Sequence, residues 1–250
     1  MTPAYVELYN SGRLSRCAEE LLEKLRRCSL CPHRCGVNRV EDERGLCRSG
    51  IKPMVSSFNA HFGEEAPLVG RSGSGTIFFT NCNLGCIFCQ NYDISHLGRG
   101  EEVSYRRLAE MMISLQGRGC HNINFVTPTH MNYAIVRALM EAVPMGLRIP
   151  LVYNSGGYDA ADILSILDGV YDIYMPDFKY MDPETAGRLS GAPDYPGAAM
   201  AAIREMHRQV GDLVLDQNGI TRRGLLVRHL VLPNNIAATD RVINFIADLS

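Results

Sequence analysis

The chain has 250 residues, of which 46% are hydrophobic and 21% are charged, and its formal net charge is −2. This length allows one large α/β domain or two small ones with a buried core. The small net charge gives no basic field for nucleic acid, and the apolar runs are too short to span a bilayer. The N-terminal stretch lacks the apolar centre of a signal peptide. We therefore expect a cytoplasmic protein without a nucleic-acid or membrane partner.

The first predicted element is a short amphipathic helix over residues 15–27. The next stretch, "CSLCPHRCGVNRVEDERGLCRSG" (28–50), is rich in cysteine, glycine and charge and cannot build an apolar core. It contains four thiols, at Cys28, Cys31, Cys35 and Cys47. Four thiolates close a tetrahedral zinc site or saturate an iron–sulfur cluster, so we expect a bound metal to supply the folding energy. Zinc and an iron–sulfur cluster both stay open, while a reducing compartment disfavours disulfides.

From residue 76 onward, short apolar strands alternate with helices. We predict strands over residues 76–80, 122–127, 149–154, 172–179 and 224–232, and helices over 105–118, 133–143, 160–167, 184–189, 195–210 and from 239. This alternation indicates βαβ units and a parallel sheet, and Asn218-Gly219 indicates a hairpin before the last strand. The predicted fold class is α/β, a partial (β/α) barrel of about five to six parallel strands behind a cysteine-rich metal-binding segment. We divide the chain into 1–60, the helix and four-cysteine segment, and 61–250, the barrel.

Three cysteines follow the first predicted strand directly, in "TIFFTNCNLGCIFCQN" (76–91). They are Cys82, Cys86 and Cys89, and the carboxyl end of a strand is where parallel α/β barrels build their active sites. Three thiolates can hold three irons of a [4Fe–4S] cluster and leave the fourth iron without a protein ligand. An open metal position is typical of a catalytic site. A partial zinc site or three unrelated thiols are the alternatives.

This Cys-x3-Cys-x2-Cys loop resembles the signature of the radical S-adenosylmethionine (SAM) enzymes. The resemblance implies that the amino and carboxylate groups of SAM chelate the open iron. It further implies that the reduced cluster donates one electron to the sulfonium, and that a 5′-deoxyadenosyl radical takes a hydrogen atom from substrate. Phe88, before the third cysteine, is implied to lie near the adenine, and packing on the cluster loop is a compatible interpretation.

Downstream segments resemble the glycyl-radical-activating branch, in particular the pyruvate formate-lyase activating enzyme-related (PflX-type) proteins. The segments are "GCHNINFVTPTH", "YNSGGYD", "YMPDFKY" and "VRHLVLP", each at the end of a predicted strand. The resemblance implies that polar residues there bind the cofactor: Thr127, Thr129, Asn154, Ser155, Asp177, Lys179 and Arg228. The activating enzymes carry Gly-Gly-Glu-Pro where this chain has "VTPT". That carboxylate contact is therefore missing, and the two threonines with backbone carbonyls are expected to replace it.

Several residues also have structural interpretations. Asp177 and Lys179 could form a partly exposed ion pair of little energetic consequence. We interpret His229 as a core histidine bonded to backbone, His130 as a cap of the following helix, and Cys17 and Cys120 as packing residues. The stretch over residues 64–75 is expected to be a flexible approach to the first strand.

The predicted function is reductive cleavage of SAM on a [4Fe–4S] cluster, followed by hydrogen abstraction. The resemblance implies a glycine of a partner glycyl radical enzyme as substrate and a reductant such as flavodoxin or ferredoxin. Modification of a small molecule or peptide is the alternative within the superfamily. A metal-stabilised redox or binding module without SAM chemistry is the alternative from another class.

Overall fold

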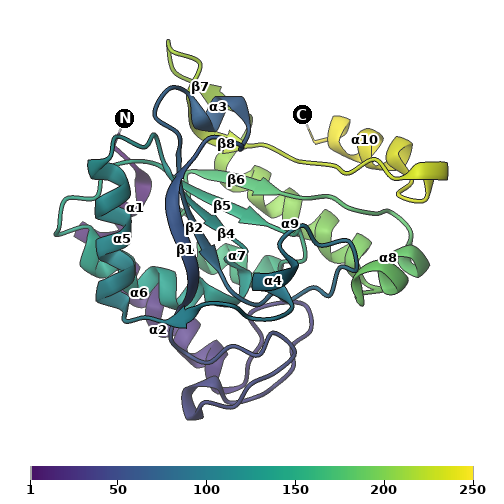
Figure 1. Ribbon diagram of the computed structural model, residues 1–250, viewed down its shortest axis with the longest axis horizontal. Helices are drawn as coiled ribbons and strands as arrows, with labels where there is room; N and C mark the ends of the chain where they lie inside the picture. Colours follow the sequence, from purple (N-terminus) through teal and green to yellow (C-terminus); the bar gives the residue numbers. More distant parts are fainter. Residues whose placement is uncertain (1, 250) are drawn as a thin grey trace.

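The structure is a computed structural model and describes residues 2–249. The strands are β1 (Met54–His61), β2 (Ser74–Phe79), β3 (Glu101–Glu102), β4 (Ile123–Val126), β5 (Leu151–Ser155), β6 (Ile173–Pro176), β7 (Val214–Leu215) and β8 (Thr221–Leu225). They form one sheet in the order β3-β1-β2-β4-β5-β6-β8-β7 (Figure 1).

Several helices pack on the outer face of this sheet, around the main core. The α-helices are α1 (Ala4–Asn10), α2 (Arg13–Arg26), α3 (Ala66–Val69), α4 (Tyr92–Ser95), α5 (Tyr105–Gly117), α6 (Asn132–Ala142), α7 (Ala161–Ile166), α8 (Pro183–Ser190), α9 (Tyr195–Val210) and α10 (Thr239–Ala247). Short 3-10 turns are η1 (Arg39–Glu41), η2 (Thr129–Met131) and η3 (Pro233–Asn235). Among the residues that the structure describes, no helix is long and apolar enough to cross a membrane.

The five central strands β2, β4, β5, β6 and β8 pair in parallel, which confirms the predicted α/β class and its mostly parallel sheet. Three further strands are antiparallel: β1 to β2, β3 to β1, and β7 to β8. The β7–β8 pair is the predicted hairpin around Asn218-Gly219. The predicted division between residues 60 and 61 falls within β1, which pairs with the barrel sheet, and the division itself stays a prediction.

The last core strand differs from its predicted bounds. Regular pairing begins at Thr221, earlier than expected, because the hairpin brings β7 and β8 together. Beyond β8 the chain still follows β6, since Leu226 N donates to Tyr174 O at 2.9 Å and Arg228 N donates to Pro176 O at 3.0 Å. It then leaves the sheet. Arg228 is therefore held against the end of β6, opposite Asp177.

The two faces of the sheet have different chemistry because side chains alternate along each strand. Phe125, Tyr153 and Tyr174 point outward into the main core beneath the helices. The neighbouring positions point into the curve of the sheet, where Val152 packs with Ile173 and Met175. Two of these inward positions are polar, at Asn124 and Asn154.

The connection between β1 and β2 fills the inner side of the sheet at its amino end. Leu68 of α3 packs on the inward apolar residues of β5 and β6, and its carbonyl accepts a hydrogen bond from Asn122 Nδ2 at 2.9 Å. Figure 1 shows α3 beside the β7–β8 hairpin, away from α4 and the cysteine-rich segment. The open end of the curved sheet is therefore its carboxyl edge.

Candidate functional site

The three-thiol loop, residues 80–91, leaves β2 at the carboxyl edge of the parallel sheet. Asn81 has a φ of 64°, a left-handed conformation that turns the chain out of the strand. The amide of Leu84 donates to Cys82 Sγ at 3.3 Å. The three sulfur atoms lie in one neighbourhood, since Cys82 interacts electrostatically with both Cys86 and Cys89. The three predicted ligands thus lie on one loop, and their role as ligands of a metal stays a prediction.

Hydroxyl groups from two helices lie beside the other two sulfur atoms. Cys89 Sγ is 3.1 Å from Ser95 Oγ in α4, and Cys86 Sγ is 2.9 Å from Ser190 Oγ in α8. Tyr180, which also contacts Ser190, meets the ring of Phe88 edge-on with the centroids 6.4 Å apart. Phe88 therefore packs against Tyr180, which contacts Ser190 beside the loop, and stays 37% exposed. Its contact with adenine remains a prediction.

The donor chemistry of this loop fits an iron–sulfur cluster. Thiols with hydrogen-bond donors at sulfur, packed among apolar side chains, are the surroundings that such clusters use. Burial raises the pKa of Cys82 to about 12 and also raises the pKa of Cys86, so metal binding must displace their protons. Within residues 2–249, no three His, Cys, Asp or Glu side chains have the arrangement of a formed metal site.

A network of charged side chains lies along the same edge, centred on Arg228. Its Nε donates to Asp177 Oδ1 at 3.0 Å, its Nη1 to Glu64 Oε1 at 3.0 Å and its Nη2 to Asn154 Oδ1 at 2.7 Å. Asp177 also accepts from Lys179 Nζ at 2.6 Å. Two cations and two carboxylates balance, so this charged network is neutral as a whole.

Lys179 connects the charged network with the three-thiol loop. Burial favours the neutral form of Asp177, but Lys179 and Arg228 outweigh it and lower the pKa of this carboxyl below its usual value. Burial likewise opposes the charge on Lys179, whereas Asp177 and Cys86 raise its pKa above the ordinary value. Both groups are therefore charged at neutral pH, and the ammonium lies within electrostatic reach of a thiol. The pair belongs to a network and is more than an isolated surface contact.

Glu64 is a site residue that the sequence analysis missed. It lies in the stretch expected to be a flexible approach, yet only 10% of its side chain is exposed. Its Oε2 accepts from Asn124 Nδ2 at 2.9 Å and from Asn154 Nδ2 at 3.1 Å. The signal that could have found it is indirect. Two asparagines and an arginine at inward positions of apolar strands need a buried partner.

Two predicted cofactor ligands turn away from the charged network. Ser155 follows Asn154 in β5, so strand alternation points its side chain to the opposite face. Its Oγ donates to Asp159 Oδ2 at 2.6 Å, and Thr129 Oγ1 donates to Asp159 Oδ1 at 2.6 Å. Burial raises the pKa of Asp159, and these hydrogen bonds oppose the shift. Thr129 and Ser155 thus fix the loop around a buried carboxyl, and direct contact with SAM remains a prediction for both.

Thr127, the remaining predicted ligand, has a φ of 61° at the end of β4. A left-handed conformation is strained for a β-branched residue, at about 1–2 kcal/mol, and such strain clusters at functional sites. Its amide donates to Asn154 O at 2.9 Å, which ties it to the end of β5. The strained backbone therefore lies where the resemblance places a cofactor contact.

His229 and His130 both lie close to a backbone carbonyl oxygen. His229 lies 2.6 Å from Phe178 O through Nδ1, which confirms the predicted backbone contact, but it is half-buried and is not the core residue that was predicted. His130 does not cap α6; its Nε2 lies 2.9 Å from Thr80 O. Burial lowers the pKa of His130 to about 4, so it is neutral. Cys17 and Cys120 belong to the main core, as predicted for packing residues.

The four-thiol segment, residues 27–53, joins α2 to β1. Three of its cysteines are buried, Cys35 is exposed, and Cys31 interacts electrostatically with the other three. The sequence prediction of a metal here remains a prediction.

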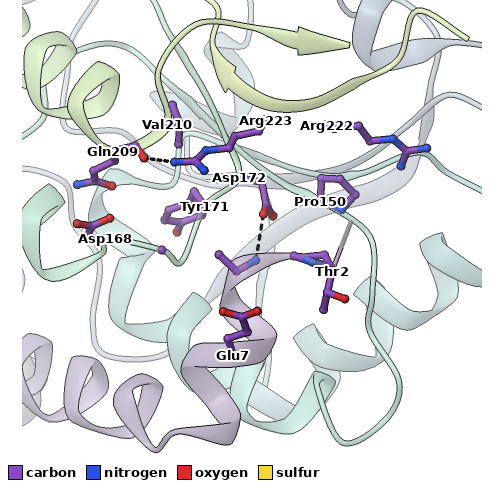
Figure 2. A pocket seen from close by; sticks show the side chains of 13 residues that line it. Thr2, Glu7, Pro150, Asp168, Tyr171, Asp172, Gln209, Val210, Arg222 and Arg223 are labelled. Carbon is purple, nitrogen blue, oxygen red and sulfur yellow. Dashed lines mark hydrogen bonds between the residues drawn. The ribbon is translucent and has the colours of Figure 1, made fainter. Parts of the chain in front are cut away.

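A hollow lies at the amino end of the sheet (Figure 2). Asp172 accepts there from Ala4 N at 3.2 Å and from Leu151 N at 3.0 Å. Burial raises the pKa of Asp172 to about 6. Arg223 donates to Gln209 O. This carboxylate ties the start of α1 to the sheet, and no cysteine lines the hollow.

The parallel sheet is curved, and the three-thiol loop lies at its carboxyl edge, beside a charged network whose net charge is zero. These features define a class of α/β proteins built around an open iron–sulfur site. Residues 76–217, more than half of the chain, match the family profile of the Radical SAM superfamily. The chain belongs to the radical SAM superfamily. Membership implies a [4Fe–4S] cluster and SAM as cofactors, and it confirms the superfamily prediction.

A protein of Methanocaldococcus jannaschii, described as uncharacterized protein MJ0674, is 34% identical to this chain over 229 residues. The match covers 88% of this chain and 61% of that protein, so the chain spans less than two thirds of the length of its relative. Its description names no substrate. The activating-enzyme-related branch therefore stays a prediction.

Proposed function

We propose that this chain reductively cleaves SAM and directs the resulting 5′-deoxyadenosyl radical to a hydrogen atom of its substrate. The observation that carries the proposal is that the three-thiol loop and the charged network occupy one edge of the sheet, with Lys179 between them. When bound to Cys82, Cys86 and Cys89, a [4Fe–4S] cluster would supply the electron for this cleavage at an iron that no cysteine of the loop ligates.

The residues of the chain bind and orient the cofactor. The methionine part of SAM carries an ammonium and a carboxylate, and the charged network presents groups of both signs. Arg228 and Lys179 suit the carboxylate, while Asp177 and Glu64 suit the ammonium. Asn154 faces the charged network, and Thr127 offers backbone groups at the edge of that network. Thr129 and Ser155 contribute by holding the supporting loop through Asp159.

The proposed substrate is a glycine of a partner glycyl radical enzyme, on the resemblance to the activating-enzyme-related proteins. Exposed apolar side chains support a macromolecular substrate. Ile87 is 69% exposed beside the thiols, and Leu230 and Val231, which follow Arg228, are 50% and 69% exposed. Apolar residues exposed near a site favour contact with another protein.

The proposal includes a second metal on the four-thiol segment, zinc or an iron–sulfur cluster, and a reductant such as flavodoxin or ferredoxin. Nine free cysteines suit a reducing compartment, for which the cytoplasm is the proposed location.

Anaerobic reconstitution followed by reduction with SAM tests the central claim. We expect 5′-deoxyadenosine and methionine in equal amounts, measured by mass spectrometry. Reconstituted protein that binds iron but releases no 5′-deoxyadenosine would support a redox module instead.

A second experiment tests the glycyl substrate separately. A candidate partner labelled with deuterated glycine is expected to transfer deuterium into 5′-deoxyadenosine. Deuterium-free product in the presence of that partner would remove the glycyl part of the proposal and leave SAM cleavage standing.

A further inference from the structure

The four-thiol segment has little regular structure to hold its shape. Between the end of α2 at Arg26 and the start of β1 at Met54, the described chain forms one 3-10 turn, η1. A connection of this length without its own helices or strands is uncommon in a compact domain unless it is functional or held by something else. The thiols nevertheless lie within electrostatic range of one another, since Cys31 interacts with the other three.

Backbone amides lie near sulfur here, as one does in the three-thiol loop. The amides of Leu30 and His33 oppose the burial that raises the pKa of Cys28 and of Cys31, respectively. Each donor lies two residues after its cysteine, as Leu84 does after Cys82. Amide donors stabilise sulfur in its anionic form. The segment therefore shares the sulfur environment of the loop that the family identifies as a cluster site.

Arg39 is a buried cation beside these thiols. It is 2% exposed, and its Nε and Nη2 donate to the carbonyl oxygen of Gly50. Its Nη1 has no hydrogen-bond partner within residues 2–249, and none of the ion pairs in that range includes Arg39. The guanidinium interacts with Cys28.

A buried guanidinium is costly without an opposite charge. A divalent ion held by four thiolates is a net anion, so a metal centre on these cysteines would supply the missing charge. The unsatisfied Nη1 of this buried guanidinium is thus an observation independent of the cysteine spacing, and it points to the same kind of ligand.

The segment also touches the three-thiol loop through residues that lie close to its own thiols. His33, between Cys31 and Cys35, has its Nε2 2.8 Å from Asn83 O, next to Cys82. The His33 ring also packs edge-on against Tyr158, whose carbonyl accepts from Asn83 Nδ2 at 2.6 Å. One face of the loop is therefore held by the first half of the segment.

The second half of the segment holds the flanks of the loop. Arg48, next to Cys47, donates from Nη2 to Ser95 O at 3.2 Å and to His96 O at 2.6 Å. Ser95 is the residue whose hydroxyl lies beside Cys89. Ser49 Oγ accepts from Asn81 Nδ2 at 3.4 Å, immediately before Cys82.

We infer that Cys28, Cys31, Cys35 and Cys47 hold a metal–thiolate centre, whose negative charge Arg39 offsets in part, and that this centre braces the three-thiol loop through His33, Arg48 and Ser49. Its metal is zinc or iron–sulfide. Its role is structural, because four ligands leave no open position. Fixing the four thiols fixes the backbone at 33 and 48–49, and this backbone sets where the loop lies. The inference rests on the proposed function, which already includes a metal on this segment, and adds the role of Arg39 and the bracing of the loop.

Metal analysis tests the site without any SAM chemistry. The chain with Cys82, Cys86 and Cys89 all changed to Ala is reconstituted anaerobically, once with zinc and once with iron and sulfide. We expect one zinc or one four-iron cluster per chain, and its loss when Cys47→Ala is added. Absence of stoichiometric metal in both preparations would overturn the site.

If the triple variant does not fold, Cys28→Ala in the otherwise unchanged chain must lower the metal content, whereas Cys17→Ala, a buried cysteine outside both sets, must not.

The brace is tested with variants that keep all seven thiols. His33→Ala with Arg48→Ala should retain the metal of the four-thiol segment yet weaken SAM binding about tenfold. SAM binding is followed by the change that SAM causes in the EPR spectrum of the reduced cluster. Arg44→Ala, an exposed arginine of the same segment paired with Asp42, is the matched control.

A SAM titration of the double variant that coincides with that of the unchanged chain would overturn the brace. Iron loss from the three-thiol loop to a chelator provides a second readout that needs no SAM, and the double variant is expected to lose iron faster. Wild-type protein without any SAM response would contradict the proposed function, while the metal count and the iron-loss rates would still decide the inference.

Discussion

At the two ends of the parallel sheet, the pKa of a buried aspartate is shifted in opposite directions. At the carboxyl edge, Asp177 is paired with Lys179 and Arg228, and this pairing lowers its pKa. At the amino end, Asp172 accepts hydrogen bonds from two backbone amides, and burial raises its pKa to about 6. Paired charges stay ionised and available to a charged ligand, whereas a lone buried carboxylate ties chain segments together. We therefore expect the carboxyl edge to bind the cofactor and the amino end to stabilise the fold.

The largest effect on SAM cleavage should come from the thiols. Both ends of the sheet carry a buried cysteine, so the same substitution can be compared at each end. Cys86→Ala removes a predicted cluster ligand, and we expect SAM cleavage to fall more than about 100-fold. Release of 5′-deoxyadenosine under reducing, anaerobic conditions measures it. Cys120→Ala, just before β4 at the amino end, is the control and should keep its activity. Similar activity in the two variants would mean that the carboxyl edge is not the reacting end.

The next effect concerns arginines. Arg228→Ala leaves the carboxylates of Glu64 and Asp177 facing each other without their shared cation. We expect SAM cleavage to fall about 10–100-fold from misplacement of the cofactor. Arg222→Ala at the amino end removes one ion pair with Asp216 and should change activity less than about twofold. Steady-state rates of both variants test the contrast, and equal losses would contradict it.

A smaller effect is expected at the inner end of the charged network. Glu64→Gln keeps the shape of the side chain but cannot accept from Arg228 and from both asparagines at once. The lost hydrogen bond is worth about 1 kcal/mol, or about fivefold in the affinity for SAM. Isothermal titration with SAM measures it, and Glu65→Gln is the neighbouring control. An unchanged affinity would show that Glu64 serves the fold alone.

Features that depend on residues close together in the chain could be predicted from the sequence. Apolar strand-like runs that alternate with helical segments predicted the five parallel strands, and one sequence stretch of 16 residues (76–91) contains the three predicted ligand thiols. Glu64 could not be found this way, because its partners lie 60, 90 and 164 positions away in the chain. The brace is equally non-local, since His33 and Asn83 are 50 positions apart. By contrast, strand alternation could have separated Asn154 from Ser155, because neighbours in a strand face opposite sides.

The smallest effect on activity is expected at the amino end, where Asp172→Asn should change stability and its pH dependence instead. The folded protein binds a proton at Asp172 up to about pH 6, whereas the unfolded chain releases it near the ordinary value of 3.8. Stability from this group is therefore present at low pH and is lost as the pH rises through 6. Between pH 5 and 7.5 the unchanged chain should lose about 1.4 kcal/mol relative to Asp172→Asn, measured by urea unfolding. Asp168→Asn, an exposed carboxylate lining the same hollow, is the control. Parallel pH profiles of the unchanged chain and Asp172→Asn would show that this carboxylate is not buried as the structure has it, and equal rates of SAM cleavage in both would leave the contrast between the two ends intact.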